Sequence, residues 1–274
     1  MDFEIPYTDE QEEFRKEVGT WLEQNGPKME IPEELMMGPE HIQEFNAWRE
    51  RLGKKGWLAP TWPKELGGGG LTPAHAVVIR EEVSRRGFPQ AGDLGLSLGA
   101  PAMMIHGTEE QKQRFIPPIL KGEVGTWQVF TEPEAGSDLA SLRTRGVRDG
   151  DVYVVNGSKQ FVGSPRKPDF LYTLVNTNPD APRHENISAF LIPAKLAGIT
   201  IAPMDLVGGG GKQFVFFDNV RVPTDCLIGQ EGKGWNIANT TLELEHGGSG
   251  SPGGEVSGPR GSMLRQVIEY LKTA

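Results

Sequence analysis

The spacing of apolar residues changes near Glu123, and this change constrains the fold more than any other feature of the sequence. Before this point, apolar side chains recur every three or four residues, as they do on one face of an α-helix. After it they alternate in short runs, as they do in β-strands. We therefore expect an all-α domain, followed by a domain built from antiparallel strands.

Helix start signals support the first half of this division. Thr8 and Thr108 each begin a capping box, in which a Thr and a Gln three residues later bind free amides of the first turn. Thr72-Pro73 supplies an N-cap and a proline at the first helical position. A further helix is expected after Gly38-Pro39, ending at Gly53 and Gly56, and residues 94–105 predict a buried helix because they are apolar on nearly every side.

Turn dipeptides divide the second half into strands. Asp149-Gly150 and Asn156-Gly157 both suit type I′ hairpin turns, so we predict a three-stranded meander over residues 143–162. Such a set of antiparallel strands predicts a closed or nearly closed barrel, since closure protects the strand edges. Further strands are expected at residues 170–176, 187–192, 199–203 and 213–222.

A third region begins after Gly229, where helical spacing returns and continues to His246. Residues 247–261 are rich in glycine and too poor in apolar groups to fold alone. Residues 263–271 predict an amphipathic helix whose apolar stripe needs either a further domain or another subunit. The expected fold class is multidomain α and β. Its parts are an all-α N-terminal domain (1–122), an antiparallel β-barrel middle domain (123–230) and a truncated first part of an α-helical C-terminal domain (231–274).

Composition excludes several classes of function. The net charge of −9 argues against nucleic acid as the main partner, because phosphate binding needs clustered Lys and Arg. No apolar run has the length of a membrane-spanning helix. The single cysteine and five scattered histidines form neither a disulfide framework nor a metal-binding motif. We therefore expect no metal. The first residues lack a basic targeting region and a single cysteine suits a reducing compartment, so we expect a cytoplasmic protein.

The segment best suited to bind a ligand is residues 128–138, Q-V-F-T-E-P-E-A-G-S-D. A short extended run breaks at Glu132-Pro133, and small residues follow. Amides and hydroxyls in such a turn can approach a phosphate or a flat polar ring, because no bulky side chain keeps the ligand away. From these residues alone, an ordinary turn after a strand is the alternative.

Several stretches, in the family's own order, resemble the acyl-CoA dehydrogenases. Residues 130–138 resemble the flavin-binding signature of that family. The resemblance extends from the first helix to about His246. Other family landmarks are matched by G-W-L-A-P-T-W-P-K-E-L-G-G (56–68), G-T-E-E-Q-K-Q-R-F-I-P-P-I-L-K-G-E (107–123) and F-D-N-V-R-V-P-T-D-C-L-I-G-Q-E-G-K-G-W (217–235).

The resemblance implies FAD-dependent oxidation of an acyl-CoA to the 2,3-enoyl-CoA. In that chemistry a carboxylate removes the proton alpha to the thioester carbonyl, and hydride passes from the beta carbon to flavin N5. The base must be desolvated, and the carbonyl must accept hydrogen bonds that stabilise the developing enolate. The family also implies an electron-transfer flavoprotein as electron acceptor and a homo- or hetero-oligomer, either a dimer or a tetramer.

The same resemblance implies which residues bind the cofactor. Gln128, Phe130 and Thr131 fall where the family lines the pyrimidine and the ring edge of the flavin. Gly136 and Ser137 fall at the pyrophosphate turn, and Ser137 is also similar to a residue that contacts the CoA part of the substrate.

A second cofactor-binding stretch, Phe161-Val162-Gly163, is similar to a trio that packs on the flavin and bonds to N5. Gly163 stands where Thr or Ser is usual in the family. Three interpretations follow from this departure. Ser164 supplies the hydroxyl from one position later, the N5 contact comes from the backbone alone, or this subunit binds flavin poorly.

Glu245 is the candidate catalytic base, because residues 242–246 resemble the segment that carries the base in relatives similar to isovaleryl-CoA dehydrogenase. The resemblance also implies that Glu243, Leu244, Glu245 and His246 contact the substrate, with His246 in place of the customary Arg. A solvated helix carboxylate is the alternative for Glu245. For the whole chain, the alternatives are a non-catalytic partner subunit of an acyl-CoA dehydrogenase complex and a flavin monooxygenase on the same fold.

Overall fold

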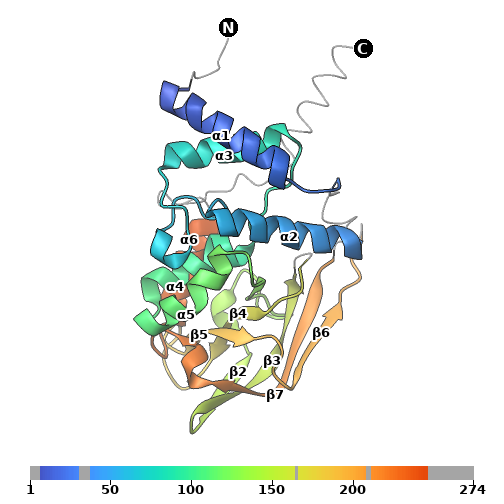
Figure 1. Cartoon of the computed structure of the whole chain (residues 1–274). Coiled ribbons are helices and arrows are strands. Elements are labelled where there is room, and N and C mark those ends of the chain that lie inside the picture. The colour runs from blue at the N-terminus through green and yellow to red at the C-terminus, as the bar shows by residue number, and fades with distance from the viewer. Residues whose placement is uncertain (1–6, 31–37, 164–165, 208–210, 246–274) are drawn as a thin grey trace.

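A computed structural model describes residues 7–30, 38–163, 166–207 and 211–245 of this chain, which form a helical part above a sheet-rich part (Figure 1). The predicted helix at residues 263–271 lies outside the described residues. Among the residues described, no helix combines the length and apolarity needed to cross a membrane. The helical part contains α1 (Asp9–Asn25), α2 (Pro39–Lys55), α3 (Pro73–Arg85), α4 (Ala100–His106) and α5 (Glu109–Leu120).

The predicted helix starts are confirmed. Thr8 Oγ1 accepts a hydrogen bond from the Gln11 amide (3.2 Å), and Gln11 Oε1 accepts one from the Thr8 amide (2.9 Å). Thr108 forms the same capping box at the start of α5, and Thr72 caps α3. Helix α2 runs through Gly53 and ends at Lys55, where Gly56 adopts the left-handed conformation (φ +78°) that glycine allows at low cost.

Residues 94–105 differ from the single buried helix that their composition predicts. A π-helical turn (η3, Gly95–Gly99) precedes α4, and the side chains of Leu94 and Ile105 are 43% and 62% exposed. A Cβ atom on Gly95 would lie 2.6 Å from the Cβ of Thr126. Glycine therefore lets this turn lie against the first strand, and the wider π geometry is of a kind often found at functional sites.

The middle part is one eight-stranded sheet with the order β6-β7-β3-β2-β4-β5-β8, in which β1 also pairs with β4. The predicted order of a helical domain before a sheet-rich domain is confirmed. A closed barrel is not, because the end strands β6 and β8 do not pair with each other. The strands are β1 (Thr126–Val129), β2 (Arg145–Asp149), β3 (Val152–Val162), β4 (Phe170–Asn176), β5 (Ile187–Pro193), β6 (Ile199–Pro203), β7 (Gln213–Pro223) and β8 (Leu227–Ile228).

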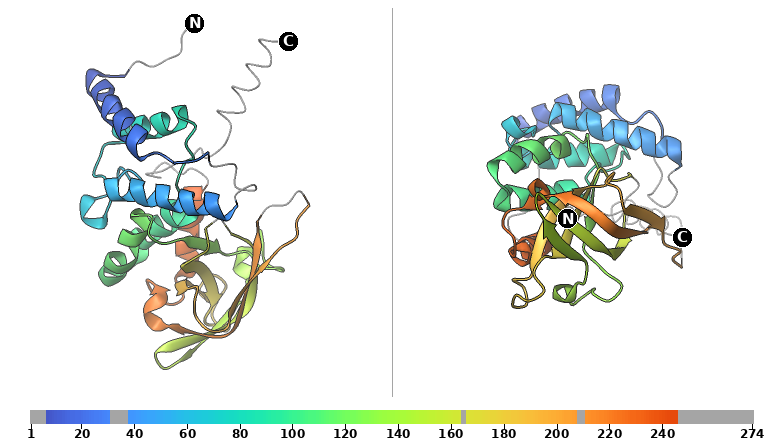
Figure 2. Two further views of the ribbon diagram at one scale, coloured as in Figure 1. Left: turned by 45° about the vertical axis from the view of Figure 1, so that its right-hand side comes forward. Right: turned by 90° about the horizontal axis from the view of Figure 1, so that it is seen from below.

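Two features of the sheet's geometry were not predicted. Strands β1 and β2 both pair with β4 in parallel, because the chain makes the β2–β3 hairpin before it returns to β4. The sheet also curves around a shared core, since Tyr153 of β3 and Phe190 of β5 have ring centroids 5.1 Å apart although their strands are not neighbours. Viewed from below, the sheet lies in front of the helical layers (Figure 2).

The predicted three-stranded meander is wrong, because β3 is one continuous strand through Asn156-Gly157. Asp149-Gly150 forms the expected turn, but Asn156 Oδ1 accepts a hydrogen bond from the Asn219 amide (2.8 Å) and keeps the chain in the sheet. The pairing of β3 with β7 shifts register between Val155 and Gly157, as it does at a β-bulge. The Asn-Gly dipeptide thus bends a strand here.

Replacing Gly157 with Ala is expected to destabilise the sheet, because the new Cβ would lie 2.4 Å from Thr144 Oγ1. We expect the free energy of unfolding to fall by about 1–3 kcal/mol, as in other overpacked sites, and urea denaturation measures it. Gly136→Ala is the matched control, since no atom lies within 4 Å of its added Cβ. Equal urea midpoints for the two variants would contradict this account.

Helix α6 (Gly234–Glu245), which was predicted, joins the two parts of the molecule. Its buried face packs against β4, β5, η3 and α4. The Tyr172 hydroxyl in β4 lies 2.8 Å from Thr241 Oγ1, and His106 Nε2 at the end of α4 lies 2.9 Å from Thr240 Oγ1. Helix α6 is therefore bonded both to strand β4 and to the helical part.

Candidate functional site

Past the end of β1, the carbonyl groups of Phe130, Thr131 and Glu132 are directed at β3. Gln128 is half-buried in β1, opposite Tyr172. The Phe130 side chain points into the core, where its ring centroid lies 5.1 Å from that of Tyr172. Thr131 is half-buried, and its carbonyl accepts a hydrogen bond from the Gln160 amide (2.9 Å). Phe130 therefore offers a ligand only its backbone, whereas Gln128 and Thr131 keep part of their surface accessible.

The turn that follows has the properties of an anion site. Glu132 and Ala135 exchange two backbone hydrogen bonds (2.9 and 3.2 Å), which close the turn. Gly136 and Ser137 are exposed, and their amides have no acceptor among the described residues. No atom lies within 4 Å of the position that a Cβ would take on Gly136. Free amides beside open space fit the pyrophosphate of a dinucleotide.

Phe161 forms the second half of the site and combines two unfavourable features. Its φ is +57°, in the left-handed region that aromatic residues rarely adopt, and its side chain is 52% exposed. Strain of this kind persists where the surrounding structure imposes it, and it gathers at functional sites. The neighbouring Val162 is buried. An apolar ring held toward solvent fits the flat face of a flavin.

The backbone explains the unusual Gly163. Its φ is +138°, a conformation that side-chain-bearing residues rarely adopt, and an added Cβ would lie 3.0 Å from the Gly211 carbonyl oxygen. A Thr or Ser would be strained at this position. Ser164, the alternative source of a hydroxyl, lies outside the described residues.

Two adjacent residues of β3 join the halves of the site. Lys159 Nζ donates to the Phe130 carbonyl (3.2 Å), and the Gln160 amide donates to the carbonyl of Thr131 (2.9 Å). Gln160 Nε2 donates to the carbonyl of Glu132 (3.2 Å). Residues 128–138 and 161–163, which the sequence predicts as one site, are thus brought side by side.

Lys159 and Glu132 form a buried ion pair that the sequence reasoning missed. Lys159 Nζ lies 2.8 Å from Glu132 Oε1, and the two side chains are 0% and 4% exposed. Burial would raise the pKa of Glu132, but the Lys159 ammonium and hydrogen bonds from the Thr144 and Arg143 amides lower it below its usual value. Burial lowers the pKa of Lys159, against the attraction of the carboxylate.

The predicted substrate-contacting residues lie at the C-terminal end of α6. Glu245 is four residues beyond the buried Thr241, so it continues the same helix face past the core. Glu245 and Glu243 are exposed, Leu244 is half-buried, and His246 lies outside the described residues. Within the described ranges, no hydrogen bond or ion pair joins Glu245 to residues 128–138 or 161–163.

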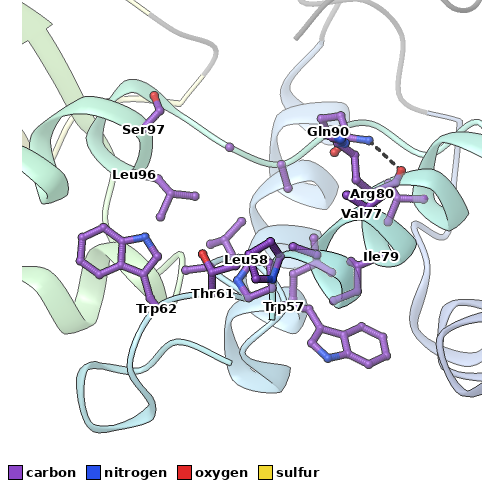
Figure 3. A pocket seen from close by; sticks show the side chains of 18 of the residues that line it. Trp57, Leu58, Thr61, Trp62, Val77, Ile79, Arg80, Gln90, Leu96 and Ser97 are labelled. Carbon is purple, nitrogen blue, oxygen red and sulfur yellow. Dashed lines mark hydrogen bonds between the residues drawn. The ribbon is translucent and has the colours of Figure 1, made fainter. Parts of the chain in front are cut away.

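An apolar groove of about 400 Å³ opens in the helical part, between α3, the loop at residues 57–62 and η3 (Figure 3). Trp57, Trp62 and Leu96 line it, and Gln90 lies at one end with Nε2 bonded to the Arg80 carbonyl (3.4 Å). None of the groove's residues belongs to the two segments described above. The connection is indirect, through η3, which also packs against β1.

Comparison with known proteins identifies the family. Residues 8–123 match the model described as acyl-CoA dehydrogenase, N-terminal domain, and residues 128–220 match the acyl-CoA dehydrogenase middle domain. The chain belongs to the acyl-CoA dehydrogenase family. The resemblance found in the sequence is therefore confirmed. Members of this family are oxidoreductases that use FAD. No three His, Cys, Asp or Glu side chains within the described ranges are grouped to hold a metal ion.

Three relatives show how far the likeness to other acyl-CoA dehydrogenases extends. "Acyl-CoA dehydrogenase FadE26" of Mycobacterium tuberculosis (strain ATCC 25618 / H37Rv) is 34% identical over 284 residues, covering 98% of this chain and 67% of that protein. A solved structure described as "Tcur3481-Tcur3483 steroid ACAD" is 33% identical with a TM-score of 0.79, covering 100% of this chain and 69% of its own. The "ChsE4-ChsE5 complex from Mycobacterium tuberculosis" is 32% identical with a TM-score of 0.76, covering 99% and 68%. The chain thus spans about two thirds of the length of each.

Proposed function

We propose that this chain is the FAD-binding part of an acyl-CoA dehydrogenase that oxidises an acyl-CoA to the 2,3-enoyl-CoA. The observation that carries the proposal is Phe161, a strained and exposed ring beside a turn with free amides. Neither feature favours the folded chain by itself, and both are accounted for by a ligand with a flat ring and a phosphate group. The membership of the chain in a family of flavoproteins supports the same ligand.

The residues of this chain have distinct proposed roles toward FAD. The amides of Gly136 and Ser137 bind the pyrophosphate, since they are exposed and have no acceptor among the described residues. Phe161 packs on the ring system, with Val162 and Gly163 beside it. Gln128, Thr131 and the Phe130 backbone contact the pyrimidine edge. When bound, FAD supplies the hydride acceptor.

The roles toward the substrate are proposals from the family resemblance. Glu245 removes the alpha proton, and the hydrophobic and closed surroundings that such a base needs must come from residues beyond the described part of this chain. Ser137, Glu243, Leu244 and His246 contact the acyl-CoA. An electron-transfer flavoprotein reoxidises the enzyme. The domain division at residues 1–122, 123–230 and 231–274 and a cytoplasmic location also stay predictions.

The acyl group and the partner are proposed from two relatives. One of them is described as a steroid ACAD, and both carry paired names, Tcur3481-Tcur3483 and ChsE4-ChsE5. We infer that this chain takes a bulky, steroid-type acyl-CoA and assembles with a second subunit that completes the site. The relatives do not favour a non-catalytic role, because the FadE26 relative is itself named an acyl-CoA dehydrogenase.

A turnover assay of the assembled complex tests this function. The chain is co-expressed with the second subunit from the same source, and dehydrogenation is followed with a dye acceptor for a steroid acyl-CoA and for butyryl-CoA. We expect enoyl-CoA formation that is faster with the steroid substrate, and slow reaction of the reduced complex with oxygen. Rapid reoxidation by oxygen would instead support a monooxygenase. Absence of product from a flavin-loaded complex would overturn the proposal.

A further inference from the structure

The buried pair of Lys159 and Glu132 lies between the two halves of the flavin site. We propose that these two residues are positioning residues, which set the spacing between residues 128–138 and Phe161. The inference rests on the proposed FAD site and goes beyond it, because neither side chain is assigned to touch the cofactor. Its basis is a set of directional hydrogen bonds that converge on the pair.

The first observation is that three consecutive carbonyl groups are fixed from one strand. The carbonyls of Phe130, Thr131 and Glu132 accept hydrogen bonds from Lys159 Nζ, the Gln160 amide and Gln160 Nε2, over 3.2, 2.9 and 3.2 Å. A segment held at three successive carbonyls cannot slide along its neighbour or rotate away from it. The next residue of β3 after this pair of donors is Phe161.

The second observation is that the pair connects four separate segments. The Lys159 ammonium has three donors, which reach the Glu132 carboxylate (2.8 Å), the Phe130 carbonyl (3.2 Å) and the Leu174 carbonyl in β4 (2.9 Å). Glu132 in turn accepts from the amides of Arg143 (2.6 Å) and Thr144 (3.0 Å), just before β2. All three ammonium donors are therefore used, as is required of a buried charge.

Stability alone does not account for a buried ion pair at this position. A buried ion pair is often no more stabilising than apolar side chains of similar volume, because both charges lose their hydration. Apolar groups, however, cannot hold a carbonyl in a given direction. Phe161 keeps its strained φ of +57° between the fixed Gln160 and the buried Val162. The pair thus supplies direction and spacing, and its loss should affect flavin binding beyond its effect on stability.

Three variants of the full chain, assembled as above, separate these two effects. Lys159→Met removes the ammonium, and Lys159→Met with Glu132→Gln removes both charges while the single carbonyl oxygen of Gln still accepts from one of the two amides, that of Arg143 or that of Thr144. Val222→Ala is the control, because Val222 is buried in β7 opposite Tyr153, at the other end of the β3–β7 ladder from Val162, which pairs with Gln213. Each variant is measured for its thermal midpoint and for its FAD dissociation constant.

We expect the single variant to lose both stability and FAD affinity, because an unpaired carboxylate is left buried. The double variant should regain part of the lost stability, because no unpaired charge stays buried, yet bind FAD about tenfold or more weakly than wild type, a change of about 1.4 kcal/mol or more. Val222→Ala should lose stability and keep its FAD affinity. Wild-type affinity in the double variant, or an equal loss of affinity in Val222→Ala, would overturn the inference.

Hydrogen exchange without FAD gives a readout that does not depend on the proposed function. If wild type binds no FAD, the proposed function fails. The hydrogen exchange of the Gln160 and Glu132 amides still tests whether the pair holds residues 128–138 in place beside β3. We expect these amides, which are bonded to the Thr131 and Ala135 carbonyls, to exchange faster in the double variant than in Val222→Ala. Equal exchange in both variants would contradict the positioning role.

Discussion

Replacing Glu245 with Gln should lower acyl-CoA oxidation by about a hundred- to ten-thousandfold, the range seen when a general base is removed. Glutamine has nearly the same shape but cannot take the alpha proton. FAD binding should be unchanged, because Glu245 lies at the end of α6, and no hydrogen bond or ion pair joins it to residues 128–138 within the described part of the chain. The measurement is steady-state turnover of the assembled, flavin-loaded complex.

Glu13→Gln is the matched control for this variant. Glu13 is also an exposed helix carboxylate, in α1, and no hydrogen bond or ion pair of its side chain is found within the described residues. Its substitution should leave turnover as in wild type. Unchanged turnover of Glu245→Gln would place the base on another subunit or on another segment, and would favour the non-catalytic interpretation of this chain.

Replacing Phe161 with Gly is expected to weaken FAD binding and to raise the stability of the folded chain. The ring is 52% exposed, so little apolar burial is lost, whereas glycine adopts a φ of +57° without strain. A residue with a side chain costs roughly 1–2 kcal/mol in this conformation, partly offset by the greater freedom of an unfolded glycine. Loss of stacking worth roughly 1–3 kcal/mol should weaken FAD binding about five- to 150-fold.

Phe161→Tyr separates the ring from the strain. Tyrosine keeps both the aromatic face and the constrained backbone, so FAD affinity and the thermal midpoint should stay close to wild type. Isothermal titration with FAD and thermal unfolding of the same samples give both quantities. A Phe161→Gly chain that loses affinity and stability together would mean that the ring is structural.

Local signals in the sequence predicted the helices well because their causes are local. The capping boxes at Thr8 and Thr108 use only atoms within one turn, so residue type and spacing suffice. Asn156-Gly157 failed for the converse reason. Its bend is decided by Asn219 and Thr144, which are distant in sequence and close only in the folded sheet. Closure of the sheet likewise depends on the relative position of β6 and β8, which no short motif encodes.

The candidate site shows the same division. The sequence brought residues 128–138 and 161–163 into one site through the family resemblance, but it gave no means of seeing that the Phe130 ring turns inward. It also left Gly163 as an anomaly, which its φ of +138° explains. The pair of Lys159 and Glu132 carried no local signal, because Lys159 stands between Ser158 and Gln160, and Glu132 between Thr131 and Pro133. Pairing across such a distance in sequence becomes visible only in three dimensions.

The most direct test of this account is whether FAD binds at the turn and at Phe161. The chain is purified alone and with its second subunit, and titrated with FAD while the visible absorption of the flavin is recorded. We predict one FAD bound per copy of this chain in the assembled complex, with an absorption spectrum that differs from that of free flavin. The Phe161→Gly complex should bind FAD more weakly. A complex that binds no FAD, or binds it equally well in Phe161→Gly, would contradict the account.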